Sequence, residues 1–340
     1  AIAGQDLNLT LSGDLTNGAG GKLQANRYVN VNAAGTVLNQ GSITGIQNVT
    51  VTGSSITNGT NATTAAGNAL SISMVGDVNN NGRLSGNNVT ITGLNIGNTG
   101  IVTAGALAVQ AGTITNSASA VMNSTGDVHL TATAGSMTNQ GTIYAQGNSD
   151  INAASLLTNA GVLAAAQNTH LSAQEILSTG TLGAGIDSDG GMGSSGDLTV
   201  NAAGVATVQG QNLTAGNLTV TAAAIDLRGG AACAGDSAAF TAAGDISNTG
   251  GLLAARCATT KTPAARPGKS RPANWSLPSA PSAIKAENSC NLAPTTWPLP
   301  WTAILTIPAA PSPPTVRPLP CAPMRWSTVR AKSSIPVWVS

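Results

Sequence analysis

The sequence predicts an all-β protein: a parallel β-helix, or solenoid, of about 12 coils over residues 1–255, followed by an irregular Pro-rich tail over residues 256–340. Three observations lead to this fold class. A short phrase recurs about every twenty residues, and apolar and polar residues alternate within each repeat. Aromatic residues make up only 2% of the chain. A thick core of large side chains is therefore excluded, and a narrow, repeated core is favoured.

The recurring phrase is clearest in residues 136–167. The segment MTNQGTIYAQ is followed by LTNAGVLAAA, and the strand-like Asp150-Ile151-Asn152-Ala153 lies between them. Asn and Gly tolerate the left-handed backbone conformation, so we expect each phrase to form a sharp corner in that conformation. The asparagines are expected to stack inside the rod as a ladder of side-chain amides. They are Asn39, Asn58, Asn98, Asn116, Asn139 and Asn159.

Each repeat also contains a short stretch of alternating apolar and polar residues, such as Val89-Thr90-Ile91. This period of two predicts a strand with one buried face, whereas a helix would need apolar residues three and four positions apart. Coils stacked about 4.8 Å apart would form a rod on the order of 55–60 Å long. The strands are expected to begin near Leu7, Val29, Val49, Leu70, Val89, Leu107, Val128, Ile151, Leu171, Leu198, Leu218 and Ala238.

The spacing is interrupted once, between Leu171 and Leu198. The excess residues are Gly183–Gly196, which we expect to form a flexible loop that projects from the rod. Loops carry binding and catalytic residues more often than the scaffolds that support them. This loop is therefore the place where a local site is expected.

The composition changes abruptly near residue 256. Twelve of the thirteen acidic residues lie before it, whereas ten of the fourteen basic residues, all sixteen prolines and all five tryptophans lie from residue 256 onward. Composition alone would assign a disordered linker. We interpret residues 256–340 instead as a frameshifted reading of further repeats. In a shifted frame the codons for residues 301–310 permit Asp-Gly-His-Leu-Asp-Asn-Thr-Gly-Gly, which is close to Gly244–Gly251. The basic charge of the tail then indicates no nucleic-acid partner.

The four cysteines show no spacing typical of metal ligands. No run of eighteen apolar residues occurs, so we expect no membrane-spanning helix.

The phrases GDLTVNAAG, residues 196–204, and LTNAGVLAA, residues 157–165, carry a family resemblance. They closely resemble the repeats of the filamentous haemagglutinin family, the exoproteins of two-partner secretion, and those of contact-dependent growth inhibition stalks. The resemblance covers residues 1–255. It implies a right-handed parallel β-helix, export through a dedicated outer-membrane partner, and a role in adhesion or in holding out a toxin. The family's secretion domain and toxin or receptor-binding segment are not recognised here, so a fragment of the shaft is expected.

Several groups of residues resemble functional sites only in part. His129 and His170 lie two coils apart without a Cys or carboxylate cluster, so surface histidines are favoured over a metal pair. Asp187-Ser188-Asp189-Gly190 resembles a calcium loop but lacks the later Glu. Gly18–Leu23 lacks the spacing and the Ser or Thr of a phosphate loop, so we expect a repeat corner.

A recurring aspartate follows glycine at several corners. We expect these residues to bond to nearby backbone as turn residues, in preference to acting as the paired acids of a glycoside-cleaving β-helix. They are Asp14, Asp77, Asp127, Asp197 and Asp245. We therefore predict no catalytic, cofactor-binding or metal-binding residues, and no cofactor.

The sequence thus predicts a non-enzymatic shaft fragment of a large bacterial adhesin, secreted or exposed at the cell surface and associated with the outer membrane. The shaft would extend a binding or toxin tip. The expected partners are an outer-membrane two-partner secretion transporter and receptors or glycans on host or neighbouring cells, with no nucleic acid. The alternatives are the stalk of a contact-dependent growth inhibition toxin and, from another class, a β-helical polysaccharide-degrading enzyme.

Overall fold

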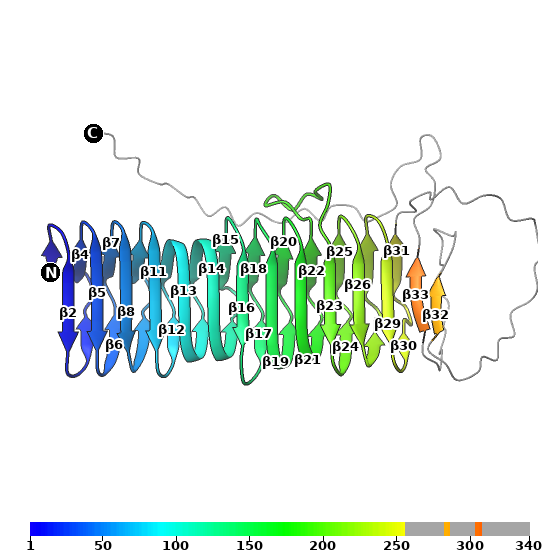
Figure 1. Ribbon diagram of the computed structural model, residues 1–340, viewed down its shortest axis with the longest axis horizontal. Coiled ribbons are helices and arrows are strands. Elements are labelled where there is room, and N and C mark those ends of the chain that lie inside the picture. Colours follow the sequence, from blue (N-terminus) through cyan, green and yellow to red (C-terminus); the bar gives the residue numbers. More distant parts are fainter. Residues whose placement is uncertain (256–281, 286–302, 308–340) are drawn as a thin grey trace, which may run out of the picture.

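The computed structural model describes residues 1–255, 282–285 and 303–307. These residues are all-β, and their parallel strands stack as a β-solenoid of about 13 turns. Figure 1 shows the turns stacked side by side along one long axis. The predicted fold class is confirmed, with about one turn more than the 12 expected. Within the described residues, no helix is long and apolar enough to span a membrane.

Each coil contributes strands to three faces, which we call the first, second and third face in chain order. The first face holds the longest run of alternating residues, and all twelve predicted strand starts lie in it. Its strands are β2 (Leu7–Leu11), β5 (Tyr28–Ala33), β8 (Asn48–Gly53), β11 (Ala69–Met74), β13 (Arg83–Asn98), β14 (Ile101–Asn116), β16 (Val128–Ala132), β19 (Ser149–Asn159), β21 (Thr169–Ser178), β23 (Leu198–Ala202), β26 (Leu218–Ala222) and β29 (Ala238–Ala242).

The other two faces are built from shorter strands. Strands β13 and β14 pass through all three faces, and β19 and β21 pass through the first two. The second face adds β3 (Leu15–Asn17), β6 (Thr36–Asn39), β9 (Ser55–Asn58), β12 (Val78–Asn80), β17 (Met137–Asn139), β24 (Val205–Val208), β27 (Ala224–Asp226) and β30 (Ile246–Ser247). The third face adds β1 (Ile2–Ala3), β4 (Lys22–Ala25), β7 (Ser42–Gly45), β10 (Thr63–Ala66), β15 (Val121–Ser124), β18 (Thr142–Ala145), β20 (Val162–Ala165), β22 (Thr181–Ala184), β25 (Gln211–Thr214), β28 (Ala231–Ala234) and β31 (Leu252–Ala255).

Strands on one face pair in parallel and in register, so like residues stack on like. Val49 and Val51 of β8 pair with Leu70 and Ile72 of β11, and all four are buried. The alternation predicted from the sequence is visible in β5, where every second residue is buried. Burying one such aliphatic side chain stabilises the fold by roughly 1.5–3 kcal/mol. One apolar core therefore runs along the rod, built from repeated small contributions.

The second face carries the expected ladder of buried asparagines. Each side-chain nitrogen, Nδ2, donates to the Oδ1 of the asparagine one coil later, over 2.7–2.9 Å. Each also donates to the carbonyl that opens the third-face strand of that coil, as Asn80 does to Ile101 over 3.3 Å. The six predicted members are confirmed, and Asn17 and Asn80 extend the ladder. It ends where Asn159 donates to the Ser178 hydroxyl, at 3.2 Å.

The glycines of the short corners do not have the left-handed backbone that we expected. Gly100 and Gly161 lie outside the set of residues with positive φ. A Cβ on Gly100 would overlap the carbonyl oxygen of Gly82, and one on Gly161 would overlap that of Gly141. Glycine is needed there because neighbouring coils approach closely. Within the described residues, positive φ occurs in wider corners between the second and third faces, at Gly20, Asn61, Gly229 and Gly250, and also between β22 and β23, at Gly185, Gly190 and Gly196.

The described part of the tail consists of two short strands. Strand β33 (Ala303–Ile307) pairs antiparallel with β29, and β32 (Ser282–Lys285) pairs in parallel with β33. The remaining residues between 256 and 340 lie outside the described residues. The frameshift interpretation therefore stays a prediction.

Candidate functional site

The one insertion in the rod lies between β22 and β23. Gly183 and Ala184 pair in register with β20 and so belong to β22, which corrects the predicted start of the loop. The loop begins at Gly185 and projects from the edge of the rod (Figure 1). Its base is fixed to the third face. Ile186, which is 5% exposed, donates its backbone N–H to the Ala165 carbonyl over 2.9 Å. The hydroxyl of Tyr144 donates to the Ile186 carbonyl over 2.9 Å.

The tip of this loop holds the two aspartates of the partial calcium motif. The Asp187 N–H donates to the Gly191 carbonyl over 2.8 Å, and the Gly191 N–H donates to the Asp189 carboxylate over 3.0 Å. These are local turn bonds. Burial, and then the nearby charges of Asp187 and Asp189, raise the pKa of the Tyr144 hydroxyl. In the described parts of the chain, no group of three or more His, Cys, Asp or Glu side chains has an arrangement that would hold a metal ion.

The two histidines lie on the outside of the first face, as expected. The register adds a residue that sequence reasoning missed: Asp150 pairs with His129 on one side and His170 on the other. The Nδ1 of His129 lies 3.7 Å from the Asp150 Oδ2, with both side chains open to solvent. The alternation in the sequence shows that all three side chains point outward, but the alignment of the three residues follows only from the register.

The corner aspartates bridge successive coils. The carboxylates of Asp14, Asp127 and Asp197 each accept the backbone N–H of a residue in the next coil, over 2.7 Å in each case. Their donors are Thr36, Asn148 and Asn217. We expected these aspartates to act as turn residues that accept from backbone close by in the same corner. Instead, the backbone N–H that each accepts belongs to the next coil. The bond reaches the next coil because the corners stack directly on one another.

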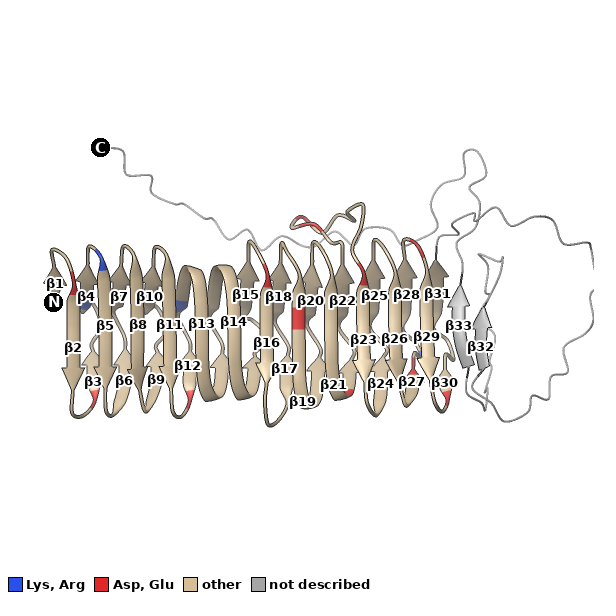
Figure 2. Ribbon diagram, viewed as in Figure 1, with Lys and Arg blue, Asp and Glu red and all other residues tan. Residues whose placement is uncertain are grey.

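The two remaining corner aspartates, Asp77 and Asp245, lie in different coils and do not form a pair of acids with each other. Asp77 accepts from the Asn95 side chain one coil later, over 2.8 Å. Asp245 lies in the corner between β29 and β30. In Figure 2 the acidic residues are spread mainly along the corners of the coils.

The Gly18–Leu23 segment consists of the corner between β3 and β4 and the first two residues of β4. The Gly21 N–H donates to the Gly18 carbonyl over 2.8 Å, and Gly20 has a φ of 73°. Lys22 is exposed at the start of β4. This geometry is that of a wide repeat corner.

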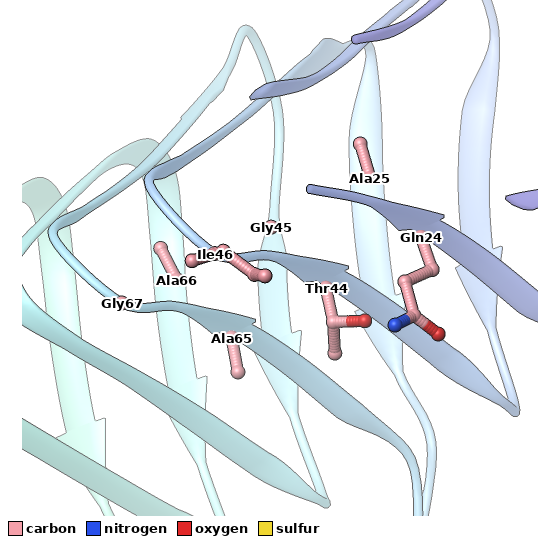
Figure 3. Close-up of a pocket in the computed structure, with 8 residues that line it drawn as sticks. All are labelled: Gln24, Ala25, Thr44, Gly45, Ile46, Ala65, Ala66 and Gly67. Carbon is pink, nitrogen blue, oxygen red and sulfur yellow. The ribbon is translucent and has the colours of Figure 1, made fainter. Parts of the chain in front are cut away.

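A shallow groove crosses three coils of the third face at its edge. Figure 3 shows that small residues form most of its surface, with the Ile46 side chain beside them. Ile46 is 63% exposed. The groove is lined by Gln24, Ala25, Thr44, Gly45, Ile46, Ala65, Ala66 and Gly67. None of these residues carries a carboxylate, an imidazole, an amine or a thiol, and Thr44 is the one hydroxyl in the lining.

These features define a parallel β-solenoid whose polar side chains mainly connect one coil to the next. The haemagglutinin-repeat profile matches residues 1–68, 47–93, 85–136, 124–192 and 193–250, which is nearly the whole solenoid. The chain therefore belongs to the haemagglutinin-repeat family, that of filamentous haemagglutinin and contact-dependent growth inhibition proteins. Members of these families are secreted or cell-surface exoproteins and in general have a transporter partner.

A stretch of 80 residues is 45% identical to the tRNA nuclease CdiA-2 of Burkholderia pseudomallei (strain 1026b). The match covers 23% of this chain and 3% of that protein. The chain thus corresponds to a small part of this relative. No solved structure gives a significant match.

Proposed function

We propose that this chain is a non-enzymatic segment of the shaft of a large bacterial adhesin that holds a binding or toxin tip away from the cell. One observation carries the proposal: parallel pairing continues from coil to coil between β1 and β31, even across the inserted loop, and the register shift between Ala153 and Leu156 of β19 does not interrupt it. Every internal coil is therefore held by two neighbours, and the position of one end of the rod fixes that of the other.

The finer features of the proposal concern location and partners. We place the shaft at the outer surface of the bacterium, associated with the outer membrane, after export through a two-partner secretion transporter. Its partners are receptors or glycans on host or neighbouring cells. Family membership supports this proposal.

A second candidate is the stalk of a contact-dependent growth inhibition toxin, which the match to CdiA-2 favours. In that case the toxic activity belongs to another part of the full protein. A β-helical polysaccharide-degrading enzyme has less support, because Asp14, Asp127 and Asp197 each bind a backbone amide of the next coil.

Deleting coils in the full-length gene tests the shaft proposal. Thr142 pairs with Val162, so removal of residues 142–161 deletes one coil and keeps the register of the remaining coils. Removal of residues 142–151 is the matched control, because it deletes half a coil and places buried residues outside. We expect the whole-coil variant to retain adherence or growth inhibition and the half-coil variant to lose it. Loss of both activities in a secreted whole-coil variant would contradict a purely structural role.

Comparison of the intact strain with a strain that lacks the gene separates the two candidates. An adhesin shaft predicts that deletion of the gene lowers adherence to host cells. A toxin stalk predicts that the intact strain inhibits neighbouring bacteria unless they carry an immunity gene. Purified protein that depolymerises a glycan, with loss of turnover on changing one aspartate, would favour the enzyme.

A further inference from the structure

The corner between β12 and the start of β13 contains a reactive pair of residues. The chain has three Asn-Gly pairs: Asn17-Gly18, Asn58-Gly59 and Asn81-Gly82. In such a pair the backbone nitrogen of glycine can attack the side-chain amide of asparagine, because glycine has no side chain to hinder the approach. In a folded chain the reaction requires that both groups be free to approach each other.

The ladder ties down the side chains of the first two pairs. Asn58 is 1% exposed, and its Nδ2 donates to the Asn80 Oδ1 over 2.8 Å. The backbone nitrogen of Gly59 donates to the Asn39 carbonyl over 2.7 Å. Asn17 is held in the same way, since its Nδ2 donates to the Asn39 Oδ1 over 2.7 Å. Attack at Asn58 would therefore require local opening of two adjacent coils.

Asn81 lies one residue beyond the ladder, and its side chain is not part of it. Its Oδ1 accepts a hydrogen bond from the exposed Thr99 hydroxyl over 2.8 Å. One coil later, the equivalent glycine, Gly100, donates its N–H to the Asn80 carbonyl over 3.0 Å. The Gly82 N–H has no such acceptor within the described residues. The preceding coil makes the wider corner through Asn61, so the two corners do not match in length.

We propose that Asn81 is a site of spontaneous deamidation selected by the fold. The Gly82 nitrogen forms a bond to Cγ of Asn81, the bond from Cγ to the side-chain nitrogen breaks, and ammonia leaves with the proton of the Gly82 nitrogen. Water then opens the succinimide ring to aspartate or isoaspartate. The reaction needs no oxidant, reductant or cofactor. The Thr99 hydroxyl stabilises the negative charge that develops on Oδ1 during the attack.

The isoaspartate product would disturb the rod at this corner. It adds one carbon to the main chain where the coils are already in close contact, since a Cβ on Gly100 would overlap the Gly82 carbonyl oxygen. The stacking of this corner on the corner between β13 and β14 is therefore expected to weaken as the protein ages.

The test uses the full chain, incubated folded and, in parallel, in urea, in a mildly alkaline buffer. Peptide mass spectrometry and isoaspartyl methyltransferase labelling follow each Asn-Gly pair with time. In the folded chain we expect Asn81 to react at least about tenfold faster than Asn58, which corresponds to ~1.4 kcal/mol of local opening. In urea the two rates should converge. Equal rates in the folded chain, or an Asn81 that reacts only in urea, would overturn the proposal.

Two variants test the individual steps. Thr99→Val keeps the branched shape of the side chain and removes the hydroxyl, and it should slow the reaction at Asn81 by at least about twofold. An unchanged rate would remove Thr99 from the mechanism. Asn81→Asp adds the charge without the extra carbon, so it should melt like the unmodified chain, whereas the isoaspartate form melts earlier. Equal melting of the two forms would contradict the argument from chain length.

Discussion

Substitution Asn98→Ala tests whether the buried ladder holds the coils together. The Oδ1 of Asn98 accepts from Asn80 over 2.8 Å. Its Nδ2 donates to the Asn116 Oδ1 over 2.8 Å and to the Val121 carbonyl over 3.3 Å. Alanine removes these three hydrogen bonds. It also leaves the buried Asn116 Oδ1 without its donor from the preceding coil.

The expected loss follows from these contacts. Each hydrogen bond contributes about 1 kcal/mol net, and a buried acceptor left without a partner costs about 1–3 kcal/mol. The substitution should therefore lower the free energy of unfolding by roughly 4–6 kcal/mol. This is a large share of the 5–15 kcal/mol that stabilises a typical domain. Because a coil contacts only its neighbours, the loss is concentrated between β13 and β14 and the strands beside them.

Asn95→Ala is the matched control in the same coil. Asn95 is exposed, yet it also bonds to both neighbouring coils: its Nδ2 donates to Asp77 over 2.8 Å, and its Oδ1 accepts from Thr113 over 2.7 Å. Water can replace both partners, so the expected loss is about 0.5 kcal/mol. Urea unfolding of the full chain, followed by far-ultraviolet circular dichroism, measures both values. If Asn98→Ala costs no more than Asn95→Ala, burial of the ladder does not stabilise the rod.

Three further predictions come from contacts in the structure, and a fourth comes from the sequence of the tail. The hydrogen bond from Arg228 lowers the pKa of Asp226, so its stabilising contribution is present above the unfolded pKa of aspartate and is lost as pH falls through the folded pKa. Asp226→Asn should therefore flatten the acid side of a plot of urea midpoint against pH, and an unchanged slope would contradict this. Gly161→Ala should cost about 1–3 kcal/mol through overlap with the preceding corner, whereas Gly13→Ala, with open space around it, should leave the melting temperature unchanged. Amide hydrogen exchange should be faster in β24, β27 and β30, which lack the asparagine ladder, than in β6, β9 and β12, and equal protection would argue against the ladder's role. Sequencing the gene across the codons for residues 250–265 should reveal an inserted or deleted base, and an intact frame there would end the frameshift interpretation.

The fold was predictable from the sequence because its signals lie within single repeats. Alternation in a stretch such as Val89-Thr90-Ile91 reports which residues are buried, and the repeated Thr-Asn phrase marks the ladder at Asn139 and Asn159. Asn80 was missed because it lies among Asn79, Asn80 and Asn81. Only the register shows which of the three side chains is aligned with Asn58 and Asn98.

The features that were missed or misassigned depend on contacts between coils. The pairing of Asp150 with His129 and His170 requires the backbone register, because the repeats differ in length. The glycine at position 100 was expected to adopt a left-handed backbone, since single-chain patterns report local conformation. Glycine is required at position 100 because any larger residue would overlap the carbonyl oxygen of Gly82 in the preceding coil. A sequence pattern therefore predicts which residues of one coil form strands and which are buried. The contacts that its polar residues make with neighbouring coils follow only from the stacking.

The direction of the ladder links this stacking to the proposed shaft. From Asn17 to Asn159 every Nδ2 donates toward the carboxy-terminal side, to the side chain and to a carbonyl of the next coil. The asparagine Nδ2 of each coil thus offers two N–H donors, and both acceptors belong to the next coil. The sequence of donors stops at Ser178, just before the insertion. In the next coil the buried Val208 stands at the equivalent position, and because Thr207 pairs with Asp226, the buried Leu227 follows it one coil later. The rod therefore consists of a laddered segment and a shorter segment held by apolar packing and backbone pairing, and tension along a shaft would separate the coils of the second segment first.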